Sequence, residues 1–288
     1  MRIIVLSVLA VFPLSFAAGP APADAKMNEP TAEQLVAAQE AYAKFGARYY
    51  ESKEFDPGAE QSFRFFHFPL KTDDDTIRDL PNLPFSFGLD LSASQVTDAG
   101  LIHLKRLTNL TYLNLNSTGM TDTGLKQVKE LKSLIKLELY ATKVTDAGMK
   151  EVKELKNLAD LTLQGTPITD AGMKEIKELK NLTCLNLRET KITDGGLKEI
   201  KQLKKLTRLQ VGNTGVTDAG VKEIAQLTHL THLNLSVCSG VTAAGVTELK
   251  GLKKLVELNL WWTPVSEAGV MEIKEALPNC RIAYGYGM

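Results

Sequence analysis

The stretch that decides the fold is LADLTLQGTPITDAGMKEIKEL, residues 158–179. Leu161 and Leu163 alternate with polar residues, and this period of two is typical of a half-buried strand. Met173, Ile176 and Leu179 are spaced three apart, which places them on one face of a short helix. The stretch therefore predicts a strand, a turn and a helix in that order.

The second half of this unit returns along the chain at a fixed spacing. Its aspartate recurs every 24 residues, at Asp98, Asp122, Asp146, Asp170, Asp194 and Asp218. A seventh copy follows after 25 residues with Ala243 in this place, and an eighth has Glu267. A fixed period in this range predicts a solenoid, in which each unit buries its apolar face only against its neighbours.

Local chemistry gives each position in the unit an expected role. Thr169 or Asp170 is suited to cap the helix, because its side-chain oxygen can accept from a backbone N–H of the first turn. Gly172 is expected where a neighbouring coil approaches closely. Another small polar residue recurs three positions after the second strand leucine and is expected to bridge the turns of adjacent units. This column contains Thr118, Thr142, Thr166, Thr190, Thr214, Cys238 and Thr263.

The pattern Leu110-x-x-Leu113-x-Leu115-x-x-Thr118, followed by Met120-Thr121-Asp122-x-Gly124-Leu125, resembles that of leucine-rich repeat proteins. The second part is similar to the cysteine-containing subtype of F-box substrate receptors and of many exported bacterial proteins, with threonine mostly replacing cysteine or asparagine. The resemblance covers about residues 83–284. It implies an α/β horseshoe solenoid, with parallel strands on the concave side, helices on the convex side and a function in binding a partner.

Residues 1–25 are predicted to form a secretory signal peptide. An apolar run follows Arg2, and cleavage after Ala17 or after Ala25 fits the small residues there. The alternative, a membrane anchor, is less favoured because the run is short and contains Ser7 and Pro13. No other segment predicts a membrane span.

Residues 26–84 are predicted to cap the first coil of the solenoid, and residues 85–288 to form the repeat domain. The expected elements of the cap are a helix in 31–47 with a capping box at Thr31, strands at 47–50 and 63–68, a turn at Asp56-Pro57-Gly58 and a degenerate repeat at 71–83. Phe63, Phe65, Phe66 and Phe68 are expected in its core. The last helix is expected at 268–276 and a final strand at 278–284.

Charge and cysteine content limit the class of partner. Lys plus Arg equals Asp plus Glu at 34 each, and a neutral chain argues against nucleic-acid binding. The helix lysines Lys150, Lys174, Lys198 and Lys222 are each followed by glutamate, which predicts a solvated face of mixed charge. Cys184, Cys238 and Cys280 are spaced too far apart in the solenoid for disulfides, so three free thiols are expected.

No catalytic constellation is evident, so the chain is predicted not to be an enzyme and to need no cofactor. The aspartate column is attributed to helix capping. His229 and His232 have no further ligand at a useful spacing, so no metal site is expected. Gly-rich phosphate loops and nucleophile motifs are also absent from the sequence.

Three columns of residues flank the two strand leucines of each unit and are expected to line the concave face. The second column lies between the two leucines, as Asn114 does, and the third follows them, as Tyr140 does. The first column precedes the leucines and contains Tyr112, Lys136, Asp160, Cys184, Arg208, His232 and Glu257. They change from repeat to repeat, whereas the helices keep a Lys-Glu-rich sequence, and this contrast favours a specific binding surface over drift. Aromatic and arginine residues are the usual anchors of protein interfaces. The predicted partner-binding residues are Tyr112, Tyr140, Arg188, Arg208, His232, Glu257, Trp261 and Trp262. The Asn- and Gln-rich second column suits hydrogen bonding to an extended peptide or a sugar.

The sequence thus predicts a secreted or periplasmic, monomeric module that binds a protein or peptide ligand. Two other functions remain open. One is a structural, self-associating role at the cell envelope or surface. The other is carbohydrate binding through Trp261, Trp262 and Tyr140.

Overall fold

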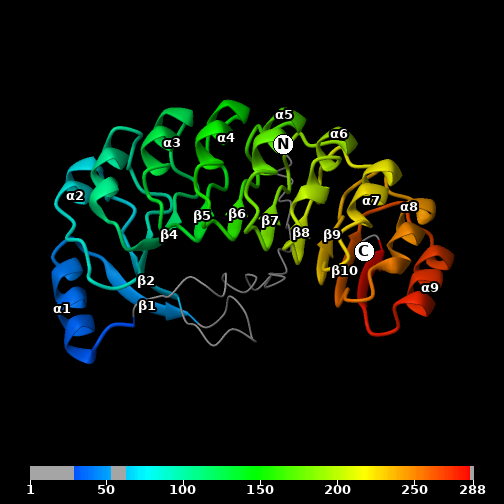
Figure 1. Cartoon of the computed structure of the whole chain (residues 1–288), viewed down its shortest axis with the longest axis horizontal. Helices are drawn as coiled ribbons and strands as arrows, with labels where there is room; N and C mark the ends of the chain where they lie inside the picture. Colours follow the sequence, from blue (N-terminus) through cyan, green and yellow to red (C-terminus); the bar gives the residue numbers. More distant parts are fainter. Residues whose placement is uncertain (1–28, 53–62, 286–288) are drawn as a thin grey trace, which may run out of the picture.

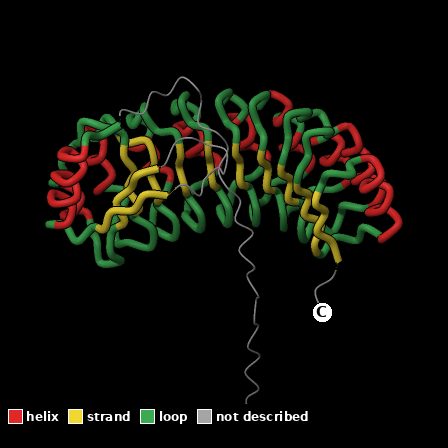
Figure 2. Tube along the Cα trace, turned by 90° about the horizontal axis from the view of Figure 1, so that it is seen from below, coloured by secondary structure: helices red, strands yellow, loops and turns green. Residues whose placement is uncertain are grey.

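The computed structural model describes residues 29–52 and 63–285. They form an arc in which one continuous sheet lines the inner side and the helices lie along the outer side (Figure 1). Figure 2 shows the same arrangement from below, with the strands side by side along the concave surface. The predicted horseshoe solenoid is confirmed. The predicted signal peptide and the turn at Asp56-Pro57-Gly58 lie outside the described residues.

The sheet has 11 strands in the order of the sequence. β1 and β2 are antiparallel, and every later neighbour pair is parallel. The strands are β1 (Arg48–Ser52), β2 (Phe63–His67), β3 (Phe87–Asp90), β4 (Leu110–Asn114), β5 (Lys136–Glu138), β6 (Asp160–Thr162), β7 (Cys184–Asn186), β8 (Arg208–Gln210), β9 (His232–Asn234), β10 (Glu257–Trp261) and β11 (Arg281–Gly285).

Helical segments alternate with the strands from β2 onward, and one helix precedes β1. They are α1 (Ala32–Ala43), α2 (Asp74–Arg78), α3 (Asp122–Val128), α4 (Asp146–Val152), α5 (Asp170–Ile176), α6 (Asp194–Leu197), α7 (Asp218–Ile224), α8 (Ala243–Thr247) and α9 (Glu267–Ala276), with 3₁₀ helices η1 (Gly100–Arg106), η2 (Ile200–Gln202) and η3 (Glu248–Gly251). The expected last helix and final strand are therefore confirmed as α9 and β11.

Leucine columns form one core that runs the length of the arc. Leu161 and Leu163 are fully buried, and so are Met173, Ile176 and Leu179 from the same unit. Helix α5 ends at Ile176, so Leu179 lies in the turn after the helix and not on its face. Burial of this repeated apolar set supplies the stability of the fold, because each coil covers the next.

The N-terminal cap extends the sheet. Thr31 and Gln34 form the expected capping box at the start of α1. Tyr42 of α1 is fully buried and stacks on Phe66, with ring centroids 4.1 Å apart. Because side chains alternate along β2, Phe66 and Phe68 enter the core while Phe65 lies on the concave side, 5.7 Å from Tyr112. The expectation that Phe65 belongs to the core is therefore wrong.

The aspartate column joins neighbouring coils and does not cap its own helices. In helices α3 to α8 the threonine before this position is the N-cap, as Thr145 is for α4. The carboxylate of Asp146 accepts from the backbone N–H and the hydroxyl of Thr169, one coil further on, at 2.8 and 2.6 Å. The expectation that the aspartates cap their helices is wrong, because the first helical position directs its side chain toward the next coil, whereas Thr169 caps α5 as expected. We call this series of contacts the Asp–Thr ladder.

The Asp–Thr ladder has seven rungs along the described coils. They are Asp74–Thr97, Asp98–Thr121, Asp122–Thr145, Asp146–Thr169, Asp170–Thr193, Asp194–Thr217 and Asp218–Thr242. The first rung starts in the degenerate repeat, whose residues Ile77, Leu80 and Leu83 are buried as in a regular coil. The predicted close approach at Gly172 is confirmed, because a Cβ there would lie 2.7 Å from Oδ1 of Asp146.

The threonine column after the second strand leucine also differs from expectation. Thr166 donates to the carbonyl of Leu163 in its own unit, and five equivalent threonines do the same. Only Cys238 reaches the preceding unit, with its Sγ 3.3 Å from the carbonyl oxygen of Val211. A hydroxyl on a short side chain reaches the local carbonyl more easily than one a full coil away.

The ladder stops at Ala243, which predicts that an aspartate there will stabilise the last coil. Ala243→Asp places a carboxylate 23 residues before Ser266, the same offset as in six of the rungs, so that it can accept from the Ser266 N–H and hydroxyl. We expect a gain of about 1 kcal/mol in the free energy of unfolding, measured by urea denaturation.

Ala244→Asp is the matched control. It adds the same charge to the first turn of α8, with the same benefit from the helix dipole, at an exposed position. Equal stabilisation by the two substitutions would contradict the assignment of the ladder.

Candidate functional site on the concave face

In the central part of the first concave column, positively and negatively charged side chains pair with one another. The pairing of β4 to β10 aligns Tyr112, Lys136, Asp160, Cys184, Arg208, His232 and Glu257 in one row, as predicted. The Lys136 ammonium lies 2.7 Å from Oε1 of Glu138 and 3.7 Å from Oδ2 of Asp160. It also lies 5.2 Å from the ring centroid of Tyr112. These contacts hold the row together within the protein.

Burial and neighbouring charges shift the pKa values of this row in opposite directions. Burial alone would lower the pKa of Lys136, but the carboxylates of Asp160 and Glu138 outweigh it and hold this pKa above its ordinary value. Burial raises the pKa of Asp160, and the Lys136 ammonium opposes that rise. Burial also raises the pKa of the Cys184 thiol. A thiol in this state is a weak nucleophile, so Cys184 acts as a small packed residue.

The second column uses much of its hydrogen-bonding capacity within its own strands. The side-chain oxygens of five residues accept from the backbone N–H two positions later, at 2.9 to 3.0 Å. They are Asp90, Asn114, Asn186, Asn234 and Asn259. Asn234 and Asn259 are almost fully buried. These local hydrogen bonds turn the chain at the end of each strand. The expectation that the second column forms hydrogen bonds to a peptide or sugar is therefore wrong for these oxygens.

The third column carries the exposed aromatic rings. Tyr140 and Trp261 are 38% and 37% exposed, and each ring lies across a glycine of the next coil. A Cβ on Gly165 would lie 3.4 Å from Cε2 of Tyr140, and one on Gly285 would lie 3.3 Å from Cζ3 of Trp261. Each ring therefore packs against the backbone of the next coil at a position where a side chain would crowd it.

The predicted site residues fall into two groups. Tyr112 and Arg208 are 4% and 6% exposed, so they offer a partner little accessible surface. His232 and Glu257 are half-buried, and His232 Nδ1 lies 2.9 Å from the Thr231 hydroxyl. Arg188 is half-buried and Tyr140, Trp261 and Trp262 are exposed.

Distance along the sheet separates the exposed residues. Tyr140 follows β5 and Trp261 ends β10, so five strand spacings of about 4.8 Å, or roughly 24 Å, lie between them. Arg188 follows β7 and lies between the two. The surface is therefore a row of separate anchors along the arc.

Arg188 has an acceptor requirement that its described neighbours do not meet. Its Nε is buried, and no described residue accepts a hydrogen bond from it. Its Nη2 lies 3.9 Å from Oε1 of Glu189, which is too long for a hydrogen bond. A buried guanidinium N–H without an acceptor is costly, so an acceptor on a bound ligand would be favourable here.

Sequence reasoning missed the ionic contacts of the first column. Lys136 and Asp160 were assigned to the column but not to the site, although opposite charges 24 residues apart must become neighbours once the period is known. The change of charge from Lys136 to Asp160 along the column was the sequence signal for this ion pair.

All three cysteines are free and buried, in agreement with the predicted free thiols. Burial raises the pKa of Cys280 to about 11. Across residues 29–52 and 63–285 no cluster of His, Cys, Asp or Glu has the arrangement of a metal site. Within the same ranges none of the helices combines the length and the apolar character needed to cross a membrane.

Comparison with known proteins identifies the family. Residues 142–281 match the family described as leucine-rich repeat region, and residues 106–128 match the one described as leucine rich repeat. Internalin C2 from Listeria monocytogenes is similar in structure, with a TM-score of 0.55 and 23% sequence identity over 86% of this chain and 92% of that chain. No curated protein sequence matches. The chain is a leucine-rich repeat protein.

Proposed function

We propose that this leucine-rich repeat protein is an exported, monomeric and non-catalytic module that binds a protein or peptide along its concave face. The observation that carries the proposal is the row of third-column side chains Tyr140, Arg188 and Trp261. Two exposed aromatic rings and an arginine are side chains of the kind that anchor protein interfaces. The apolar run at residues 3–16 supports export.

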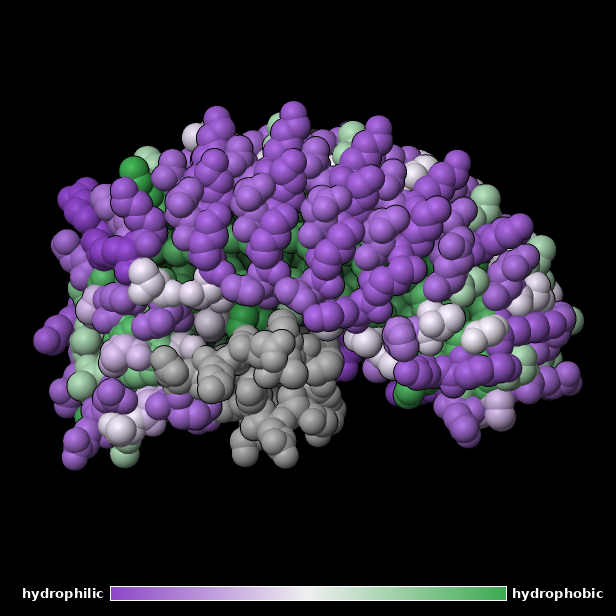
Figure 3. Space-filling model, viewed as in Figure 1, coloured by the Kyte–Doolittle hydropathy of each residue, from purple (hydrophilic) through white to green (hydrophobic). Residues whose placement is uncertain are grey.

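The outer surface supports this choice of face. Hydrophilic side chains cover the helical side of the arc (Figure 3). Several of them pair between coils, as Lys129 does with Glu151 at 2.8 Å and Lys153 with Glu175 at 2.8 Å. Such paired and solvated charges offer little surface for a partner to desolvate, whereas exposed aromatic rings gain from being covered.

The test is crosslinking capture from the native host, with the mature chain as bait. We expect Tyr140→Ala combined with Trp261→Ala to abolish capture of the partner without unfolding the chain, because both rings are exposed. Met271→Ala is the control, since it removes an exposed apolar side chain from helix α9 rather than from the concave face. Loss of the partner with the control as well as with the double variant would contradict the assignment of the face.

Two other outcomes correspond to other functions. Recovery of the bait alone, equally with the double variant, would indicate the structural, self-associating role. The exposed rings of Tyr140 and Trp261 also suit stacking on a sugar, so a glycan array is the second measurement. A glycan that binds wild type and not Trp261→Ala would replace the peptide ligand with a carbohydrate.

A further inference from the structure

The edge of the solenoid that precedes the strands changes its chemistry between the two halves of the chain. In each coil two loop residues follow a buried leucine at this edge. In chain order these pairs are Thr108-Asn109, Lys132-Ser133, Lys156-Asn157, Lys180-Asn181, Lys204-Lys205, Thr228-His229 and Lys253-Lys254. The second position therefore changes from asparagine or serine to lysine or histidine after Asn181.

The asparagines and the serine tie each coil to the one before it. Nδ2 of Asn157 donates to the carbonyl of Lys132 at 2.9 Å, and Nδ2 of Asn181 to that of Lys156 at 2.8 Å. Asn109 and Ser133 make the equivalent bonds earlier in the chain. At Lys205 the pattern ends, and its ammonium donates instead to Oδ1 of Asn181 at 2.8 Å.

The acidic residues of this edge disappear at the same point. The residue before the buried leucine is Arg106 in the first of these coils, Glu130, Glu154 and Glu178 in the next three, and Gln202, Gln226 and Gly251 in the later ones. We define the basic edge as Lys204, Lys205, His229, Lys253 and Lys254, all of which are exposed. Among the residues that the structure describes, no carboxylate forms an ion pair with these four lysines, whereas Lys177 and Lys250 pair with Glu199 and Glu272 on the helical side.

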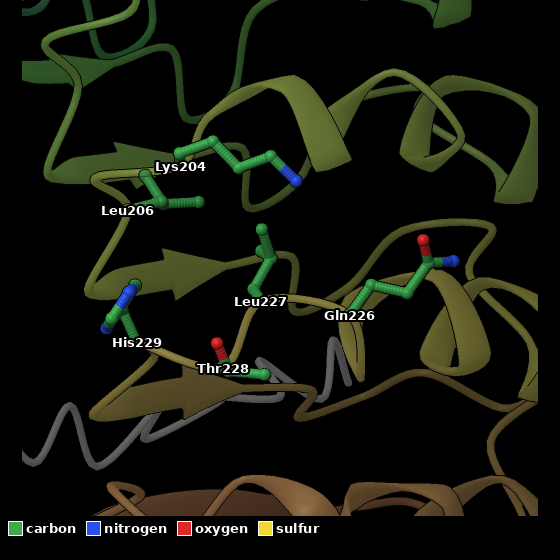
Figure 4. Close-up of a pocket in the computed structure, with 6 residues that line it drawn as sticks. All are labelled: Lys204, Leu206, Gln226, Leu227, Thr228 and His229. Carbon is green, nitrogen blue, oxygen red and sulfur yellow. The ribbon is translucent and has the colours of Figure 1, made fainter.

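A small hollow lies within the basic edge. It has a volume of about 120 Å³ and is lined by Lys204, Leu206, Gln226, Leu227, Thr228 and His229. Leu206 and Leu227 lie between the side chains of Lys204 and His229 (Figure 4). The Lys254 ammonium lies 3.1 Å from Nδ1 of His229, and with Nδ1 as the acceptor the neutral ring carries its proton on Nε2. The hollow thus combines apolar walls with N–H donors and positive charge.

We propose that the basic edge binds a short acidic segment of a protein partner, independently of the concave face. Three coils at about 4.8 Å spacing span roughly 10 Å, which matches about three residues of an extended chain. A glutamate suits the hollow, since its methylenes contact Leu206 and Leu227 while its carboxylate meets Lys204 and His229. Val256 beside the lysines is 54% exposed, and one such residue serves a peptide side chain better than it anchors a membrane.

The test is fluorescence anisotropy at low salt with a labelled hexaglutamate peptide. Lys205→Asn with Lys254→Asn restores the asparagine of the earlier coils, so this double variant should fold with an unchanged or higher melting temperature. We expect it to weaken binding at least about ten-fold, because it removes two of the charges that face the peptide. Lys132→Asn with Lys156→Asn is the matched control, with the same change of charge at the same edge, and should weaken binding less than about two-fold.

Several results would overturn the proposal. Equal loss in the two double variants would indicate attraction to net charge alone, and unchanged affinity in Lys205→Asn with Lys254→Asn would remove the site. Hexaglutamine binding as tightly as hexaglutamate would exclude recognition of charge. Preferential binding to vesicles that contain phosphatidylserine, with no hexaglutamate binding, would assign the edge to a membrane.

Trp261→Ala should leave hexaglutamate binding unchanged, which separates this proposal from that for the concave face. If the asparagine variant fails to fold, Lys205→Gln with Lys254→Gln gives the same measurement.

Discussion

Replacing Asp146 with alanine is expected to lower the free energy of unfolding by about 3 kcal/mol. Asp146 accepts three hydrogen bonds from the next coil, from the Thr169 N–H at 2.8 Å, the Thr169 hydroxyl at 2.6 Å and the Gly172 N–H at 3.0 Å. Bonds to a charged acceptor contribute roughly 1.5–3 kcal/mol each, and water reaching this half-buried position recovers part of the loss. Urea denaturation at neutral pH measures the change.

The control for this prediction is Glu178→Ala, which removes an exposed carboxylate nearby in the chain. Within the described residues the Glu178 side chain forms no hydrogen bond or ion pair, so its loss should change stability by less than about 0.5 kcal/mol. A small and equal effect of both substitutions would show that the Asp–Thr ladder contributes nothing to the joining of coils. Asp146→Asn should lie between the two, because an amide keeps one acceptor oxygen and loses the charge.

The Asp–Thr ladder also marks the limit of what the sequence could predict. Capping rules are local, and they correctly assign an N-cap to the Thr-Asp pair, which is Thr145 in α4. The acceptor role of Asp146 depends on Thr169, 23 residues further on, and only the stacking of coils brings them together. Position within the helix therefore gives the two residues different roles. Thr145 precedes the helix and caps it, whereas Asp146 is the first helical residue and lies in the turn that faces the next coil.

The concave columns were predictable because two periods combine. Alternation along each strand assigns the face, and the fixed repeat length assigns the neighbour, so the row from Tyr112 to Glu257 follows from the sequence and is confirmed by the strand pairing. The exposure of each residue was not predictable in the same way. Arg208 and Trp261 lie on the same face, yet one is 6% exposed and the other 37%. Their difference depends on neighbouring side chains, which a period does not specify.

The aromatic residues of β2 also show where prediction from the sequence failed. Phe65 and Phe66 are adjacent in the sequence and were expected together in the core. Alternation along the strand separates them, so that Phe66 stacks on Tyr42 while Phe65 contacts Tyr50 and Tyr112 across the concave surface. Hydrophobicity correctly indicated that these aromatic residues pack against other residues. The alternation of side chains along a strand would have assigned Phe65 to the concave face and Phe66 to the core.

Replacing Gly245 with alanine is expected to cost about 3 kcal/mol in the free energy of unfolding, although alanine is the better helix former. A Cβ at this position would overlap Oδ1 of Asp218, and it would lie 2.7 Å from Cγ and 2.8 Å from Cα of the same residue. The overlap includes backbone, so a rotation of the aspartate side chain does not relieve it. Asp218 must move away, and its bonds to the N–H and hydroxyl of Thr242 are then lost.

Gly251→Ala is the matched control in the same repeat. Nothing lies within 4 Å of a Cβ built on Gly251, so this substitution should stabilise the chain by about 0.5–1 kcal/mol through the unfolded state. The double variant Asp218→Ala with Gly245→Ala gives the decisive measurement. Because the first change removes the carboxylate that the new methyl meets, the pair should cost at least about 1 kcal/mol less than the sum of the single changes. Strict additivity would contradict the view that the repeated glycine exists to admit the aspartate of the preceding coil.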